Sequence, residues 1–204
     1  MKIGLDFDNT IVNYDKIFYD VAVEWEIIPK HIPANKLSVR NFLREADKEE
    51  RWTEMQGYVY GARMDGAQLY SGLINFIQQV KKAGYNLMIV SHKTPYPFLG
   101  PKYDLHAAAR KWIEKNICTE NNSFFNAENI FFEPTKEKKL ERIAQLKCDI
   151  FIDDLPEIIS SPNFPKSASA ILFDPDNVHT SFALQRSGIR VLSSWFEIQQ
   201  ELGL

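Results

Sequence analysis

Short apolar runs alternate with stripes of helical spacing from Gly72 onward, and this alternation constrains the fold more than any other feature of the sequence. The runs have the length and the flanking turn residues of buried strands. Including one at the N-terminus, they are Lys2–Phe7, Leu87–Val90, Ile130–Phe132, Ile150–Ile152, Ala170–Phe173 and Ile189–Leu192. Strands that alternate with helices predict a parallel sheet covered by helices on both faces. The expected fold class is therefore α/β, with a Rossmann-like parallel sheet.

The segment between the first strand and this regular region shows helical spacing instead. Ile17, Val21 and Trp25 fall on one helix face. We expect Pro29 and Pro33 to end that helix. Across the whole segment we expect two to four helices and no strands.

This change of pattern predicts two parts of the chain. Residues 1–13 and 71–204 would form the α/β core domain, and residues 14–70 a helical insertion placed after the first strand. The insertion contains 8 Lys and Arg against 10 Asp and Glu, so it is not a basic surface for a polyanion.

Composition excludes several classes of protein. With 204 residues, 45% of them hydrophobic and 25% charged, the chain is neither collagen-like nor disordered. A formal net charge of −3 argues against binding to a nucleic-acid polymer. No apolar stretch approaches the ~18 residues that span a membrane. Cys118 and Cys148 lie far apart without metal-ligand spacing, which is typical of a reducing compartment. We therefore expect a cytoplasmic location without membrane contact.

Asp6 is the first residue that points to chemistry. It lies near the end of an apolar strand, where an unpaired carboxylate is costly. Asp8 follows two residues later, so both side chains face the same way if the strand continues. Two close carboxylates repel, and a divalent cation relieves that repulsion. Oxygen ligands of this kind suit Mg²⁺ better than zinc.

Other polar residues fall at the carboxyl ends of predicted strands. Ser91 ends one strand, and Asp153 and Asp154 end another. Taken singly, each acid pair is explained about as well by a turn, and Ser91 is explained better by a helix cap. Ligands of an open α/β sheet bind beyond the carboxyl ends of its strands, so the three sets together predict one site.

These residues resemble the motifs of the haloacid dehalogenase-like (HAD) superfamily. Residues 5–10, Leu-Asp-Phe-Asp-Asn-Thr, resemble its first motif, Asp-x-Asp-x-Thr. Residues 89–91, Ile-Val-Ser, are similar to the second. Residues 151–154, Phe-Ile-Asp-Asp, are similar to the fourth, with an acid in place of the commoner Gly. The resemblance spans residues 1–192, and the first and fourth motifs are its specific parts.

The third motif of the superfamily is a lysine that begins the helix before the fourth motif. Three lysines compete for this place: Lys136, Lys138 and Lys139. We favour Lys139 because it directly precedes the apolar helix face at Leu140. Lys136 is the alternative, one helical turn away.

The resemblance implies a catalytic mechanism. Asp6 would be the nucleophile that forms an aspartyl-phosphate. Asp8 would protonate the leaving oxygen and then activate water. The aspartate at this second position separates phosphatase-like members of the superfamily from dehalogenases.

The resemblance also implies a binding role for other residues. Asp6, the backbone carbonyl of Asp8, and Asp154 would hold Mg²⁺, with Asp153 acting through water. Thr10 would position the loop. Ser91 and the chosen lysine would bind the phosphoryl oxygens.

Two residues beside the second motif stay ambiguous. His92 and Lys93 directly follow Ser91, where their side chains could reach a phosphate. They are at least as readily explained as ordinary loop residues.

By the same resemblance, the helical insertion is a C1-type cap that covers the active site. Its candidate substrate contacts include Tyr14 and Arg40. Tyr58, Tyr60 and Arg63 lie in a glycine-flanked stretch that could bind a base or a sugar ring. We favour a different reading of these aromatic residues, as the small core of the cap itself.

The resulting hypothesis is a Mg²⁺-dependent phosphatase that acts on a small phosphorylated metabolite, either a nucleotide or a sugar phosphate. One alternative is a phosphotransferase or mutase of the same superfamily. Another is a non-catalytic phosphate-binding regulatory module, which the complete pair of Asp6 and Asp8 disfavours. The sequence is compatible with a monomer or a homodimer.

Overall fold

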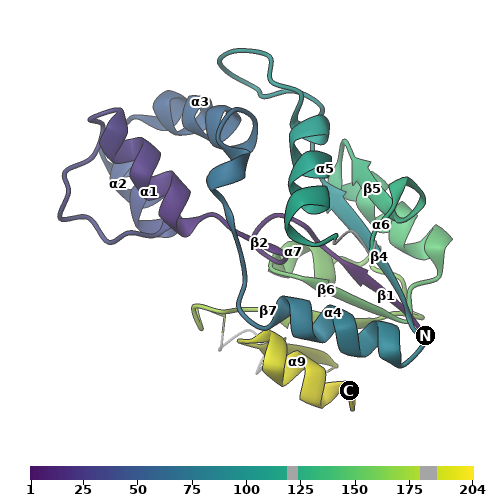
Figure 1. Cartoon of the computed structure of the whole chain (residues 1–204). Coiled ribbons are helices and arrows are strands. Elements are labelled where there is room, and N and C mark those ends of the chain that lie inside the picture. Colours follow the sequence, from purple (N-terminus) through teal and green to yellow (C-terminus); the bar gives the residue numbers. More distant parts are fainter. Residues whose placement is uncertain (119–123, 180–187) are drawn as a thin grey trace.

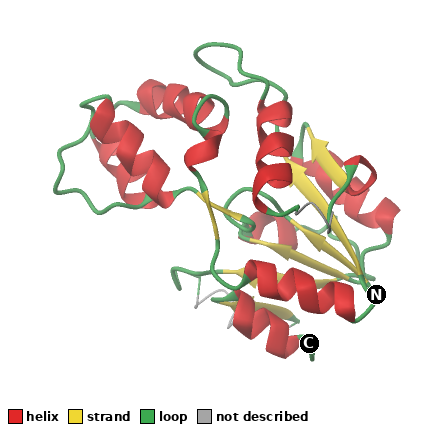
Figure 2. Cartoon of the chain, viewed as in Figure 1, coloured by secondary structure: helices red, strands yellow, loops and turns green. Residues whose placement is uncertain are grey.

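The computed structural model describes residues 1–118, 124–179 and 188–204 and contains a six-stranded sheet (Figures 1 and 2). Its strands are β1 (Lys2–Leu5), β4 (Asn86–His92), β5 (Ile130–Glu133), β6 (Ile150–Asp153), β7 (Ser169–Phe173) and β8 (Ile189–Leu192). Their order is β5-β4-β1-β6-β7-β8, and every neighbouring pair is parallel. The predicted parallel α/β sheet is confirmed.

Helices cover both faces of the sheet because its strands are apolar on both sides. On β4, Ile89 packs into one hydrophobic cluster and its neighbour Val90 into another. The first cluster includes Trp112 and Trp195, and the second includes Ile143. The helices on the first face are α4 (Leu73–Lys82), α5 (Leu105–Asn116) and α9 (Trp195–Glu201), and those on the second are α6 (Lys136–Leu146) and α7 (Pro156–Ile159).

Residues 15–66 form a helical group that stands to one side of the sheet in Figure 1. Its elements are α1 (Asp15–Glu24), α2 (Lys36–Glu45), α3 (Glu49–Tyr60) and the 3-10 turn η1 (Met64–Gly66). Two short antiparallel strands connect it to the core: β2 (Val12–Asn13) and β3 (Gln68–Leu69). None of the described helices is long and apolar enough to cross a membrane.

Two glycines let α3 approach the core closely. A Cβ atom on Gly57 would lie 2.6 Å from Pro97 Cβ, and one on Gly61 would lie 2.3 Å from Tyr103 Cβ. Real Cβ atoms do not come this close, so larger residues at these positions would push the helix away. The glycines therefore help to fix where the helical group sits on the core.

Two details of the helical group differ from prediction. Residues 68–69 form β3, although we expected no strands between residues 14 and 70. The first helix ends at Glu24, before either proline, because Glu26 adopts a left-handed backbone conformation (φ 55°). Pro29 and Pro33 therefore do not end it.

The strands at the site also differ slightly from prediction. β1 ends at Leu5 and not at Phe7, since the chain turns sharply at Asn9 (φ 59°). The Phe7 carbonyl accepts hydrogen bonds from the backbone N–H groups of residues 11 and 12, both at 3.0 Å. Ser91 lies inside β4, which continues to His92. Asp6 and Asp8 thus lie in a tight loop, where strand alternation does not set their directions.

Candidate active site

The candidate site lies where the three central strands end. β1 is flanked by β4 and β6, so the carboxyl ends of all three meet at one edge of the sheet. The backbone N–H of Asp6 donates to the Ile152 carbonyl at 2.9 Å, which ties the loop after β1 to the end of β6. Parallel pairing therefore brings Asp6 beside Asp153 and Asp154, although nearly 150 residues of sequence separate them.

Three carboxylates form a compact cluster at this edge. Asp6, Asp153 and Asp154 each offer an oxygen, and these oxygens lie within 4.8 Å of one another. Lys139 reaches them from the first turn of α6, with its Nζ 2.5 Å from Asp6 Oδ1 and 2.6 Å from Asp153 Oδ2. Its side chain is 1% exposed. Thr135 caps α6 by accepting the Lys138 N–H at 3.2 Å, which fixes the helix start.

Burial dominates the electrostatics of this cluster. It raises the pKa of Asp6 to about 7; Lys139 opposes the rise, and the charges of Asp153 and Asp8 add to it. Burial, followed by the charges of Asp6 and Asp153, raises the pKa of Asp154 well above its ordinary value. The single positive charge of Lys139 is therefore not enough to keep all three carboxyl groups ionised. A hard divalent cation fits this set of buried carboxylate oxygens.

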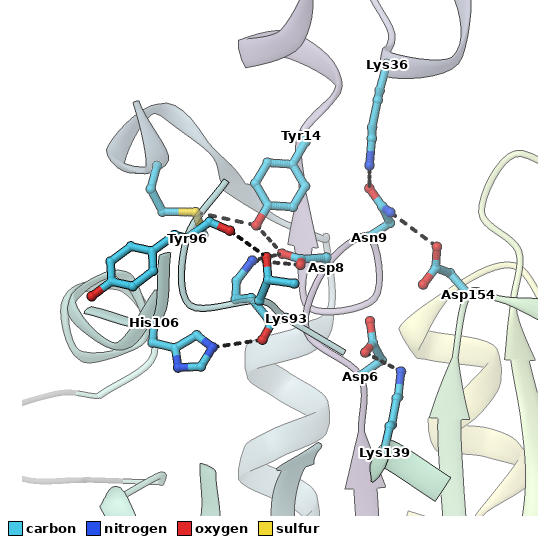
Figure 3. A network of polar contacts seen from close by, with 12 residues as sticks. Asp6, Asp8, Asn9, Tyr14, Lys36, Lys93, Tyr96, His106, Lys139 and Asp154 are labelled. Atoms are coloured by element: carbon cyan, nitrogen blue, oxygen red, sulfur yellow. Dashed lines mark hydrogen bonds and ion pairs between the residues drawn. The ribbon is translucent and has the colours of Figure 1, made fainter. Parts of the chain in front are cut away.

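The environment of Asp8 differs from that of Asp6. Figure 3 shows both side chains with their partners. Lys93 Nζ lies 2.8 Å from Asp8 Oδ2 and 3.1 Å from Oδ1, and the Tyr14 hydroxyl donates to Oδ1 at 2.5 Å. Burial alone would raise the pKa of Asp8, but Lys93 and Tyr14 outweigh it and lower this pKa. His106 Nε2 lies 2.8 Å from the Lys93 carbonyl and helps to hold that loop.

A third set of contacts connects the acid cluster to the helical group. Asn9 Nδ2 donates to Asp154 Oδ2 and Thr10 Oγ1 donates to Asp154 Oδ1, both at 3.3 Å. Lys36, the first residue of α2, donates from Nζ to Asn9 Oδ1 at 2.8 Å. In Figure 3 its side chain extends toward the loop that carries Asn9. The Lys36 Nζ lies 5.5 Å from the centre of the Tyr60 ring.

Most of the predicted site residues come together. Asp6, Asp153, Asp154 and Lys139 form the acid cluster, Asp8 and Thr10 lie in the adjoining loop, and Ser91 is buried near the end of β4. The Asp8 side chain, however, faces Lys93 and not the acid cluster.

Three other predicted or competing residues lie away from the cluster. Lys136 pairs with Glu157 at 3.0 Å, and Lys138 pairs with Glu141 at 2.7 Å. His92 Nε2 lies 3.2 Å from the Pro134 carbonyl. Among the described residues, Lys139 is the only one of the three competing lysines that forms an ion pair with the acid cluster.

Two basic residues of the site were missed or left undecided. Lys93 was noted only as an ambiguous neighbour of Ser91; its place just beyond the end of β4 was the available signal. Lys36 had no signal, since one lysine of a polar helix looks like any other. Only the packing of α2 against the loop after β1 brings it to Asn9.

The aromatic stretch of the insertion packs mainly within the helical group. The Tyr58 ring lies 5.2 Å from the Trp25 ring, and Arg63 pairs with Glu24 at 2.6 Å. Tyr60 packs edge-on against Tyr14 at 5.0 Å, and its ring centre also lies 4.8 Å from Lys93 Nζ. Tyr60 therefore borders the site, whereas Tyr58 and Arg63 hold α3 in place.

A cavity of about 650 Å³ opens beside the acid cluster. It is lined by Asn9 and Asp154, by residues of α2 and α3, and by the loops after β6 and β7. Its volume is within the range of small-molecule sites, roughly 300–1,000 Å³. It is large enough for a small organic molecule that reaches the acids.

Comparisons with known proteins identify the fold. No family model and no curated protein matches the sequence. Solved structures do match along nearly the whole chain. A HAD family hydrolase from Deinococcus radiodurans R1, solved with bound phosphate and sodium, superimposes with a TM-score of 0.61 at 17% identity, covering 99% of this chain and 94% of that one.

Two further structures agree with this match. A HAD hydrolase, family IA, variant 3, from Entamoeba histolytica has a TM-score of 0.59 at 17% identity, covering 98% of this chain and 96% of its own. A putative phosphoglycolate phosphatase from Lactobacillus delbrueckii subsp. bulgaricus has a TM-score of 0.60 at 13% identity, covering 98% and 97%. The chain therefore has the HAD-like fold, as its motifs predicted.

Proposed function

We propose that this protein is a Mg²⁺-dependent phosphatase that hydrolyses a small phosphomonoester through an aspartyl-phosphate on Asp6. The observation that carries the proposal is the buried contact of Lys139 with Asp6 and Asp153, beside Asp154, at the carboxyl edge of a HAD-like sheet. Structures of this fold that are named hydrolases, one of them with bound phosphate, support it.

In the first step, a carboxylate oxygen of Asp6 attacks phosphorus in line with the leaving oxygen. The phosphorus–oxygen bond to the leaving group breaks as the Asp6–phosphorus bond forms. Lys139 lies close enough to Asp6 to hold the attacking carboxylate and to stabilise the charge on the phosphoryl oxygens. Ser91, one residue before the end of the neighbouring strand β4, would bind a phosphoryl oxygen.

Asp8 would protonate the leaving oxygen and then, as a carboxylate, take a proton from the water that hydrolyses the aspartyl-phosphate. Lys93 and Tyr14 stabilise its carboxylate form, which is the form that the second step needs. A phosphate dianion beside Asp8 raises its pKa by repulsion, which favours the protonated form needed first. Lys93 and Tyr14 would act here as positioning residues.

The acid cluster would hold Mg²⁺ through Asp6 and Asp154, together with the Asp8 backbone carbonyl and with Asp153 acting through water. When bound, the ion would neutralise charge on the acids and on the phosphoryl group. Asn9 and Thr10 donate to Asp154 and hold its carboxylate in place.

The helical insertion of residues 14–70 would act as a cap. Tyr14 and Lys36 already reach from it to the loop after β1, and Tyr60 borders Lys93. A cap in this position excludes water from the site and contributes substrate contacts. The volume of the cavity supports a small substrate, which we propose is either a nucleotide or a sugar phosphate.

The test is hydrolysis of para-nitrophenyl phosphate by the full chain, with Mg²⁺ and with a chelator. We expect Mg²⁺-dependent release of phosphate, and a loss in kcat on the order of 10⁴-fold in Asp6→Asn. Asp65→Asn, an exposed acid of η1, is the control and should keep its activity. Mass spectrometry after acid quenching should find one phosphoryl group on the Asp6 peptide. Equal rates for the wild type and Asp6→Asn would refute the proposal.

A further inference from the structure

The cavity beside the acid cluster has one wall that carries cations and one that carries acids. On the α2 wall, Lys36, Arg40 and Arg44 recur at every fourth residue, so they lie along one side of the helix. The acids Glu157, Asp174 and Asp176 of the loops after β6 and β7 also line the cavity, as does Asp15, which lies beside the start of α2. The two walls differ in how far these charges are already satisfied.

Most of the acids already have partners. Asp174 accepts hydrogen bonds from the backbone N–H groups of residues 178 and 179 at 3.0 and 2.7 Å. Glu157 pairs with Lys136, and Asp15 accepts the backbone N–H at the start of α2 at 2.9 Å. Asp176 is exposed at the rim. These contacts hold the loops in place, so the paired acids do not need a positively charged ligand group as a partner.

The cations of α2 are not satisfied equally. Arg44 is neutralised by Glu49, with contacts of 2.6 and 2.9 Å. Arg40 forms no ion pair among the described residues, although its charge helps Arg44 to lower the pKa of Glu49, and its guanidinium donates to Asn41 Oδ1 at 3.5 Å. Its Nε is buried without a hydrogen-bond partner in the described part of the chain. A buried N–H donor of this kind is costly unless something binds it.

Lys36 lies between Arg40 and the catalytic end of the cavity. Its Nζ is bound to Asn9, which in turn donates to Asp154. Arg40 is four residues further along α2, about 6 Å along the helix axis. A molecule with its phosphoryl group at Asp6 would therefore pass Lys36 before its far end reached Arg40.

We propose that Arg40, assisted by Lys36, binds a second anionic group on the leaving part of the substrate, either a carboxylate or a phosphate. The inference rests on the proposed phosphatase function and narrows its substrate class to phosphomonoesters with an anionic far end. A guanidinium binds both kinds of anion through paired hydrogen bonds, and the charge makes those bonds stronger than neutral ones. A neutral far end would give the Arg40 guanidinium no partner of opposite charge.

Three open-chain six-carbon esters test this proposal, since they differ mainly at the far end. Sorbitol 6-phosphate has a neutral end, 6-phosphogluconate a carboxylate, and mannitol 1,6-bisphosphate a second phosphate. We expect the wild type to prefer one or both anionic esters in kcat/KM. In Arg40→Gln, the kcat/KM for the anionic ester divided by that for the neutral ester should fall by roughly 10- to 100-fold. In the control Arg44→Gln, the ratio should stay within about twofold, because Glu49 already occupies that guanidinium.

Calorimetric binding of the same esters to Asp6→Asn, with and without Arg40→Gln, separates this proposal from the proposed function. Selective binding that depends on Arg40, with no hydrolysis of any ester or of para-nitrophenyl phosphate, would refute the phosphatase and keep the anion site. Hydrolysis without preference for an anionic end would refute the anion site. An equal fall in kcat/KM for all three esters in Arg40→Gln would refute it too. Absence of both hydrolysis and Arg40-dependent binding would refute both. The preferred anionic ester shows whether the second group is a carboxylate or a phosphate.

Discussion

Asp6 and Asp8 stand two residues apart, yet different parts of the chain control them. Asp6 contacts Lys139 of α6 and lies beside the acids that end β6, all of them in the α/β core. Asp8 contacts Lys93, which follows β4, and Tyr14, which immediately precedes the first helix of the insertion. The pKa of Asp6 is raised to about 7 by burial, whereas the pKa of Asp8 is lowered because Lys93 and Tyr14 outweigh burial.

The contrast shows how one short loop provides two chemical roles. A crowded acid cluster with too little positive charge attracts a cation, and in the proposed mechanism that cation and Lys139 attract the phosphoryl group. Asp8 already has a cation in Lys93 and a hydroxyl donor in Tyr14, so its carboxylate is stable without a bound metal ion. In the proposed mechanism, the core would therefore provide the nucleophile and the metal ligands, while the acid–base residue Asp8 would also depend on where the insertion packs.

Lys139→Met should have the largest effect on stability. Removing this cation leaves the buried carboxylates of Asp6 and Asp153 without their ion-pair partner, so the free energy of unfolding should fall by about 3 kcal/mol in metal-free buffer. Activity on para-nitrophenyl phosphate should fall on the order of 10³-fold. Urea denaturation and steady-state kinetics measure the two effects.

Lys138→Met is the matched control, since Lys138 is exposed and pairs only with Glu141 among the described residues. It should change stability by less than about 0.5 kcal/mol. Added Mg²⁺ should stabilise Lys139→Met more than it stabilises the wild type. A similar loss of stability in both variants would show that the acid cluster does not need Lys139.

The surroundings of Asp6, which belong to the α/β core, were predictable from the sequence. Asp6, Asp153 and Asp154 end apolar strands, and parallel strands align their carboxyl ends whatever the details of packing. Lys139 followed from its place before Leu140 on a helix that runs into β6. Even so, β1 ends one residue before Asp6, because the turn at Asn9 is a local backbone feature that hydrophobic pattern does not encode.

The pH dependence of stability should have opposite signs at the two aspartates. Asp6 binds a proton more tightly in the folded chain, with a pKa of about 7 against 3.8 for the ordinary group, so its ionisation destabilises the fold as pH rises through this interval. The lowered pKa of Asp8 makes its contribution present above its ordinary pKa and lost as pH falls below it.

In metal-free buffer, raising the pH from about 5 to about 8 should therefore make Asp6→Asn more stable relative to the wild type, by on the order of 2 kcal/mol. Asp8→Asn should be less stable than the wild type at both of these pH values. Denaturant titrations at each pH give the comparison. A pH-independent difference between Asp6→Asn and the wild type would contradict the assignment of a raised pKa to Asp6.

Removing the cation at Asp8 should have a smaller, kinetic effect. Lys93→Met leaves burial unopposed, so the pKa of Asp8 should rise and the acid limb of the kcat profile should move to higher pH. We expect kcat to fall about 30-fold, with KM changed by less than about threefold. Lys93→Arg should recover part of the loss. An increase in KM alone would show that Lys93 binds substrate and does not position Asp8.

The part of the site that the sequence did not reveal belongs to the insertion and its contacts. Lys36 and Tyr14 approach the loop only because three helices pack in one particular arrangement on the core, and helix faces give no information about that arrangement. Gly57 and Gly61 take part in it, since α3 could not approach Pro97 and Tyr103 with larger residues. Docking of this kind depends on tertiary shape, which one sequence shows poorly.

The smallest expected effect is that of Tyr14→Phe, which removes one donor from Asp8 and keeps the ring. The ring packs against Phe18 and Tyr60, so stability should change by about 1 kcal/mol or less. We expect kcat to fall about fivefold, because Lys93 still holds Asp8 but its carboxylate can turn more freely. Tyr19→Phe on the adjoining helix α1 is the control, since its hydroxyl donates to the Lys30 carbonyl away from the site. If the two variants kept equal activity, Asp8 would depend on the core alone, and the insertion would not control the acid–base residue.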